Sequence, residues 1–130
     1  MILKDNPFSM KHSLKVGDKV IDFSTPKIMG VLNVTPDSFY DGGKNNSIKK
    51  AIYQSKLMVD EGAEFIDVGG YSSRPGAKEV SVEEEISRTV PVVDAIHKAI
   101  PDITISIDTF RQKVAKQNID KGATWVNDIS

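Results

Sequence analysis

Amide and carboxylate side chains mark the ends of the four segments that we predict to be buried strands. These residues are Asn33, Asp67, Asp108 and Asn127. Burying such a group without a hydrogen-bonding partner costs free energy, so four occurrences suggest a shared cause. In parallel α/β proteins, the carboxyl ends of the strands form the functional face. We therefore predict that the four side chains converge on one pocket, although each could instead only cap the loop or helix that follows it.

The elements that position these residues alternate along the chain. Residues 28–32 are continuously apolar, which is typical of a strand buried on both faces in a parallel sheet. Further strands are predicted at residues 65–68, 103–107 and 125–126, and helices at residues 47–62, 81–97 and 111–121. We expect Ser47 to cap the first helix and Ser81, with Glu84, to form a capping box on the second. Pro91 predicts a kink there.

Two similar segments support a repeated strand–helix unit. Residues 61–67 and 121–127 each end a helix at glycine, turn, and begin a strand. Alternating strands and helices predict right-handed βαβ units and a parallel sheet, although helix ends can also look alike by chance. Before this unit, residues 14–16 and 20–23 flank Gly17-Asp18-Lys19 and predict a short β-hairpin. We divide the chain into a leader with this hairpin, residues 1–23, and a domain over residues 24–130.

The loops favour a barrel over a doubly wound sheet. The loops after the first and second strands are long, as active-site loops of β/α barrels often are. No Gly-x-Gly-x-x-Gly turn follows the first strand, and the chain has no Gly-x-x-x-x-Gly-Lys-Ser/Thr segment. The glutamates from Glu83 to Glu85 are interpreted as a charge cluster at a helix start, not as a metal site.

Composition excludes several classes of function. A chain of 130 residues makes one ordinary domain, and a formal net charge of −1 provides no basic field for nucleic acid or an anionic membrane. There are no cysteines, so disulfides and cysteine-based metal sites are absent. No apolar run approaches the roughly 20 residues of a membrane span. The lack of cysteines fits a reducing compartment, and we expect a cytoplasmic protein.

Three segments resemble the dihydropteroate synthase family. They are Gly30-Val-Leu-Asn-Val-Thr-Pro-Asp-Ser-Phe-Tyr-Asp-Gly-Gly43, Asp67-Val-Gly-Gly-Tyr-Ser-Ser-Arg-Pro-Gly76, and Ser106-Ile-Asp-Thr109 followed by Asn127-Asp-Ile129. The first two are long and specific, and the third falls in the expected order. Together they span about four fifths of the chain.

The resemblance implies the N-terminal half of an eight-stranded TIM barrel, with about four parallel strands and three helices. Similar enzymes are transferases of folate biosynthesis. They condense a dihydropterin methyl diphosphate with 4-aminobenzoate, giving dihydropteroate and diphosphate, with Mg²⁺ assisting the departure of the diphosphate. By this resemblance Asn33 is the metal ligand, and its neutral amide oxygen suits Mg²⁺. Asp108 and Asn127 would line the pterin pocket.

The same resemblance assigns substrate contacts to the two long loops. Ser73, where the family usually has threonine, and Arg74 would contact the pterin diphosphate. Phe39, Asp41 and Pro75 would join them in loops that close over the site and form the aminobenzoate pocket, where sulfonamides also bind. Phe39 could instead be an ordinary packed aromatic residue. Tyr71 stands where the family pattern has an acidic residue.

The resemblance covers only part of a barrel. A complete one needs about 250 residues, and this chain stops as its fourth strand ends. We expect the chain alone to be inactive and poorly soluble, or to pair with another half, and the full-length enzyme to be a homodimer. Two other hypotheses are a pterin-binding methyltransferase that uses methyltetrahydrofolate and a non-catalytic half-barrel that serves binding or assembly.

Overall fold

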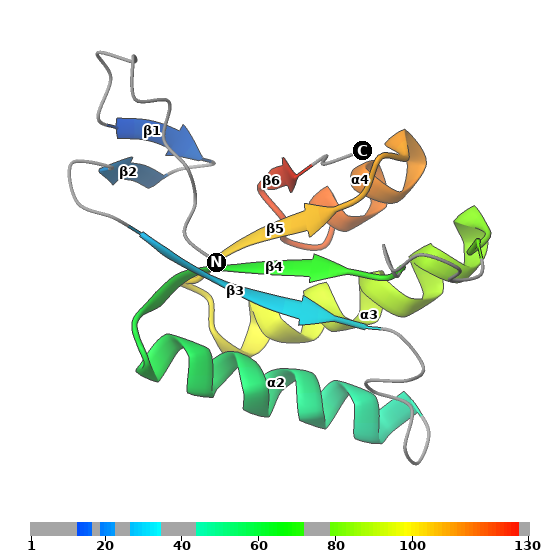
Figure 1. The fold of residues 1–130 in the computed structure, drawn as a ribbon, viewed down its shortest axis with the longest axis horizontal. Coiled ribbons are helices and arrows are strands. Elements are labelled where there is room, and N and C mark those ends of the chain that lie inside the picture. The colour runs from blue at the N-terminus through cyan, green and yellow to red at the C-terminus, as the bar shows by residue number, and fades with distance from the viewer. Residues whose placement is uncertain (1–12, 17–18, 23–26, 35–43, 72–78, 128–130) are drawn as a thin grey trace.

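A parallel four-stranded sheet with helices on one side forms the body of the molecule (Figure 1). The structure is a computed structural model and describes residues 13–16, 19–22, 27–34, 44–71 and 79–127. The strands lie in the order β3-β4-β5-β6, with bounds Ile28–Asn33, Ala63–Gly69, Thr104–Asp108 and Trp125–Asn127. Strand order in the sheet follows chain order, so each strand–helix unit places its strand beside the previous one.

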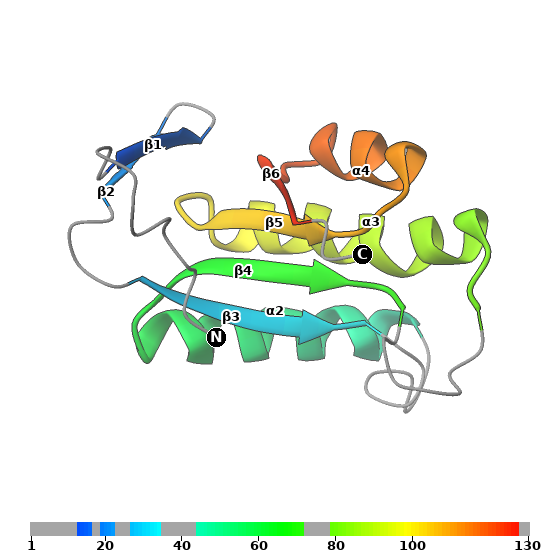
Figure 2. The same ribbon diagram turned by 45° about the horizontal axis from the view of Figure 1, so that its top comes forward.

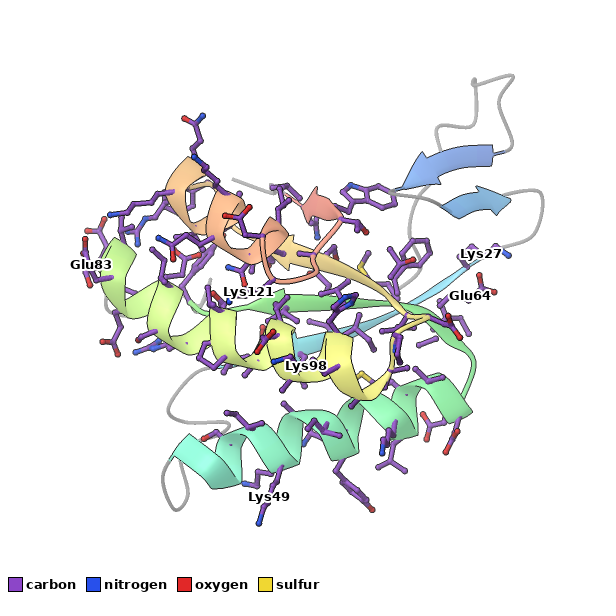
Figure 3. The ribbon with its side chains drawn as sticks, turned by 180° about the vertical axis from the view of Figure 1, so that it is seen from behind. Lys27, Lys49, Glu64, Glu83, Lys98 and Lys121 are labelled. Carbon is purple, nitrogen blue, oxygen red and sulfur yellow. The ribbon has the colours of Figure 1, made fainter. Side chains whose placement is uncertain are left out.

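Within the described residues, three helices connect the strands. They are α2 (Lys44–Asp60), α3 (Val82–Ala99) and α4 (Gln112–Ile119), and Figure 3 shows them together on one side of the sheet. The four strands and three helices match the number predicted from the sequence. Lys27 and Glu64, whose Nζ and Oε2 atoms are 3.3 Å apart, point toward one another at the amino-terminal end of β3 and β4 (Figure 3).

The predicted hairpin is also present. β1 (Ser13–Val16) pairs antiparallel with β2 (Lys19–Asp22). Both views place the hairpin beside the amino-terminal ends of the sheet strands (Figures 1 and 2). It therefore lies at the opposite end of the sheet from the side chains that were expected to do chemistry.

Apolar side chains fill the layer between the sheet and the helices. The members of this core from the strands and helices include Leu32, Ile66, Val68, Val93, Ile96, Ile105, Ile107 and Val114. Successive residues of a strand point to opposite faces, so the intervening positions of the strands form a second face. That face also buries large side chains, since Phe65 is 0% exposed and packs edge-on against Trp125. Burial on both faces explains the apolar runs of β4 and β5. The same expectation is wrong for β3 in this structure, where Ile28 is 48% and Val31 41% exposed.

In both matching segments, a glycine follows the end of a helix and adopts the same type of backbone conformation. Gly62 has a φ of 108° and Gly122 a φ of 131°, both in the region that side chains disfavour. Each follows a helix and precedes a strand, α2 to β4 and α4 to β6. The structure therefore confirms that residues 61–67 and 121–127 repeat one helix-to-strand turn.

The helix boundaries correct one expectation and confirm another. Ser47 does not cap α2, because the helix begins three residues earlier, at Lys44, and Ser47 is buried within it. Ser81 does cap α3, where its hydroxyl accepts a hydrogen bond from the Glu84 backbone N–H at 3.1 Å. The Glu84 carboxylate accepts hydrogen bonds from Arg88 Nε and Nη2 on the next turn. Helix α3 continues through Pro91 to Ala99.

Candidate functional site

The carboxyl edge of the sheet gathers the predicted polar residues. Strand pairing sets Asn33 beside Gly69, Gly69 beside Asp108, and Asp108 beside Asn127. Gly69 leaves this row open, because a Cβ placed there would lie 3.5 Å from Asp108 Oδ2 and 3.6 Å from Asn33 Oδ1. Hydrogen bonds from Val34 N to Gly69 O and from Thr109 N to Asn127 O extend the ladder past the strand ends. Three of the four predicted residues thus share one level of the sheet.

Asp67 differs from this prediction in its position. It lies two residues before the end of β4, level with Ser106 and Trp125 and not with the strand-end row. The Ser106 hydroxyl donates a hydrogen bond to Asp67 Oδ1 at 2.6 Å, and Asn127 Nδ2 donates to Asp67 Oδ2 at 3.3 Å. The sequence predicted convergence correctly, but it did not predict that Asp67 would sit beneath the row.

Burial separates Asp67 from the residues above it. Asp67 is only 2% exposed, whereas Asn33 is exposed and Asp108 and Asn127 are half-buried. Burial raises the pKa of Asp67 above its ordinary value of 3.8, and the hydrogen bonds from Ser106 and Asn127 partly oppose this rise. The row can therefore reach a ligand, while Asp67 supports it from below.

The row suits a planar ligand that carries several N–H groups and acceptors. A carboxylate accepts hydrogen bonds, and a carboxamide both donates and accepts them. Convergent polar groups of this kind fix the orientation of a small molecule. Within residues 27–34, 44–71 and 79–127, no group of three or more His, Cys, Asp or Glu side chains could hold a metal ion. The Asn33 amide oxygen nevertheless suits Mg²⁺, a cation that usually takes only one or two protein ligands and keeps water and substrate phosphates as the others.

Five other predicted site residues lie outside the described residues. These are Phe39 and Asp41, in the segment 35–43, and Ser73, Arg74 and Pro75, in the segment 72–78. Their expected roles stay predictions. The described residues that flank the second segment are Gly70-Tyr71 on one side and Glu79 on the other.

A buried ion pair beneath the carboxyl end of β4 was missed by the sequence interpretation. Glu85 is fully buried, and its Oε1 lies 3.2 Å from Arg111 Nη1. Arg88 Nη1 donates a hydrogen bond to the Gly70 carbonyl at 3.0 Å. These contacts join the start of α3 to the residues that follow β4 and β5. The acidic run at 83–85 is therefore not one surface cluster, since Glu85 belongs to the interior.

The helical period contained a signal for this pair. The buried positions of α3 are Glu85, Thr89, Val92, Val93 and Ile96, spaced as one face of a helix. The apolar residues of this segment, Val82, Ile86, Val90, Val93 and Ile96, predict an inner stripe that includes the buried Val93 and Ile96 but leaves out the charged member. A carboxylate on the inner face of a helix requires a buried partner, and Arg111 provides it.

Two aromatic residues lie beside the same ion pair. Tyr71 and Phe110 pack edge to face with ring centroids 5.7 Å apart, and the Arg111 guanidinium lies 5.2 Å from the Phe110 ring centroid. Phe110 is 49% exposed. Tyr71 thus packs against the residue that follows Thr109.

No helix among the described residues is long and apolar enough to cross a membrane.

Comparison with known proteins places this geometry in a family. The family model "pterin binding enzyme" matches residues 29–130. Dihydropteroate synthase of Staphylococcus haemolyticus is 58% identical over 102 residues, which cover 78% of this chain and 38% of that protein. The chain therefore spans about two fifths of the length of such relatives.

Solved structures agree with the sequence matches. Dihydropteroate synthase of Xanthomonas albilineans with 4-aminobenzoic acid superposes with a TM-score of 0.83 at 36% identity, covering 91% of this chain and 43% of that one. The Yersinia pestis enzyme in complex with a sulfonamide drug gives a TM-score of 0.80 at 44% identity, covering 90% and 42%. These matches confirm the predicted N-terminal half of a β/α barrel. With its strand-end row, its βαβ order and a family match over residues 29–130, the chain belongs to the pterin-binding enzymes.

Proposed function

We propose that this chain forms the N-terminal half of the catalytic barrel of a dihydropteroate synthase. The proposed reaction joins a dihydropterin methyl diphosphate to 4-aminobenzoate, releasing diphosphate. The row of Asn33, Asp108 and Asn127 at one level of the sheet carries this proposal, because all three fall within motifs that resemble the family. The named relatives, which include a complex with 4-aminobenzoic acid, support it.

The row would bind the pterin by its polar edge. Asp108 accepts hydrogen bonds from N–H groups of the ring, and Asn127 adds a carboxamide at the neighbouring position. Gly69 supports this role, because the absent side chain leaves space between Asn33 and Asp108. Ser73 and Arg74 would contact the diphosphate, while Phe39, Asp41 and Pro75 would border the aminobenzoate.

Asn33 would hold Mg²⁺ through its amide oxygen. The bound ion would offset the negative charge that develops on the departing diphosphate. The exposure of Asn33 at the end of β3 supports this assignment, because a metal that keeps substrate oxygens as ligands needs an open position. Asn33→Ala should abolish the Mg²⁺-dependent part of the activity.

Three wider features belong to the same proposal. We propose that residues 24–130 form the barrel part and residues 1–23 a separate leader and hairpin. The active enzyme would be a cytoplasmic homodimer, which size-exclusion chromatography with light scattering and cell fractionation would test. The chain alone should not turn over substrate, because about half of the barrel strands would be lacking.

A chimaera tests the proposed reaction. Residues 28–130 would replace the matching segment of the Staphylococcus haemolyticus synthase, and dihydropteroate formation would be measured with both substrates. Retained activity, lost on Asp108→Asn through weaker pterin binding, supports the proposal. Lys98→Ala is the control, since Lys98 lies on the outer side of α3 (Figure 3). A folded chimaera that binds pterin without condensing the substrates would point to a binding module, and methyl transfer from methyltetrahydrofolate would point to a methyltransferase.

The coding sequence provides a second test, which separates the synthase from the non-catalytic half-barrel. A reading frame that continues past codon 130 with Lys-x-x-Ser and Arg-x-His segments supports the synthase. A stop codon at that point favours the non-catalytic half-barrel.

A further inference from the structure

Asp67 accepts hydrogen bonds from two other strands, one through each carboxylate oxygen. Oδ1 accepts from the Ser106 hydroxyl of β5 at 2.6 Å, and Oδ2 accepts from Asn127 Nδ2 of β6 at 3.3 Å. Ser106 is fully buried, and Asp67 itself is 2% exposed. The carboxylate is therefore held by the strand beside it and is itself placed to hold the next one.

The hydrogen bond to Asp67 allows the Asn127 carboxamide only one orientation. Turning the amide by 180° would bring its oxygen against a carboxylate oxygen, and an acceptor cannot bond to an acceptor. Because the Asp67 carboxylate is fixed by Ser106, it cannot turn to relieve such a contact. The amide nitrogen of Asn127 thus stays on Asp67, and the amide oxygen remains as the acceptor of that side chain.

We infer that Asp67 is a positioning residue that makes Asn127 present its amide oxygen to the ligand, so that the site selects an N–H donor at this position. The inference rests on the proposed pterin-binding function, since Asn127 is assigned to the ligand there. Asp67 does not touch the ligand in this scheme. It determines whether the amide oxygen or the amide nitrogen of Asn127 faces the ligand. A carboxamide without this hydrogen bond could present either atom.

The surroundings of Asp67 favour this role over a purely structural one. An apolar residue at position 67 would fill the interior without the cost of a buried carboxylate. That cost appears in the raised pKa of Asp67, whose first cause is burial. The Asn127 side chain is only half-buried, so its own amide group does not need Asp67 as a partner.

An exchange of the two groups tests the inference in the purified protein that contains the full chain. Asp67→Asn keeps the shape but offers both a donor and an acceptor, so Asn127 can bond in either orientation. Affinity for 6-hydroxymethylpterin, measured by fluorescence titration, should fall about tenfold, the loss expected when one good acceptor is misplaced. Adding Asn127→Asp should restore binding to within about threefold, because the carboxamide introduced at position 67 then donates to a carboxylate that presents oxygen only.

Controls separate positioning from stability. Asn118→Ala removes another buried amide, which donates to Thr89 Oγ1 and Val114 O between α3 and α4. It should lower the melting temperature without changing pterin affinity. If Asp67→Asn does not fold, the comparison between Asn127→Asp and the double variant remains. Asn127→Asp alone sets two carboxylates against each other. The double variant should therefore bind 6-hydroxymethylpterin at least about fivefold more tightly than Asn127→Asp does.

Two results would overturn the inference in different ways. An unmodified protein that does not bind 6-hydroxymethylpterin removes the proposed function and this inference together. A protein that binds the pterin, but whose Asp67→Asn variant binds equally well or whose double variant gains nothing over the singles, removes the inference alone.

Discussion

Replacing Arg111 by alanine should destabilise the fold strongly through Glu85. The Glu85 side chain is 0% exposed and that of Arg111 is 17% exposed, with 3.2 Å between Oε1 and Nη1. Removing one partner of a buried ion pair leaves an uncompensated buried charge, which costs about 3–5 kcal/mol. Loss of the guanidinium from the Phe110 ring adds about 0.5–1 kcal/mol. We therefore expect Arg111→Ala to lower the free energy of unfolding by about 3.5–6 kcal/mol.

A second pair of nearly equal length provides the comparison. Lys98 Nζ and Asp94 Oδ2 are 3.0 Å apart, but their side chains are 74% and 34% exposed. Exposed pairs four residues apart on a helix contribute about 0.3–0.5 kcal/mol. Lys98→Ala should therefore cost roughly a tenth as much as Arg111→Ala, although the separation of charges is shorter. The contrast isolates burial as the cause.

Urea unfolding followed by circular dichroism measures both changes. The double variant Glu85→Gln, Arg111→Ala closes the cycle, because removing the charge of Glu85 should reduce the cost of losing Arg111 to about 1 kcal/mol. The reasoning would be refuted by an Arg111→Ala cost below about 1 kcal/mol, or by an equal cost with and without the Glu85 charge. Either result would mean that the carboxylate reaches solvent or another partner.

Three other changes have definite expected outcomes. Gly70→Ala should cost about 1–3 kcal/mol by thermal unfolding, because its Cβ would lie 2.7 Å from Thr89 Cγ2, whereas Gly69→Ala should leave stability nearly unchanged and weaken pterin binding. Ser81→Ala should cost about 1 kcal/mol through the lost cap on α3, with Ser87→Ala as an exposed control. The pKa of Asp67 is raised on folding, so the folded state binds the proton more tightly. Relative to Asp67→Asn, stability should be full below pH 3.8 and fall as the pH rises through the folded pKa, and a flat pH difference would contradict this assignment.

Local patterns in the sequence determined the elements and their order. Apolar runs predicted the strands, glycines predicted the turns after α2 and α4, and Ser81 predicted the start of α3. These features depend on residues near one another in the chain, so a sequence carries them directly. The start of α2 was predicted less well, because Ser47 fits a cap by type but is buried inside the helix.

The sequence also determined that polar residues at strand ends would meet. Parallel strands that follow one another in the chain bring their carboxyl ends to one edge, whatever the details of packing. Asn33, Asp108 and Asn127 share that edge, as predicted. The place of the proposed site could therefore be predicted from residue types, spacing and family resemblance.

Only the tertiary structure decided which side chains support that site. Asp67 meets Ser106 and Asn127 across 39 and 60 residues of chain, and Glu85 meets Arg111 across 26. Such contacts depend on strand register and on the rotation of a helix about its axis, which long-range packing sets. A shift of one residue in a strand would turn Asp67 to the other face of the sheet. The sequence thus identifies the polar residues at the strand ends, and the packing determines how they are held.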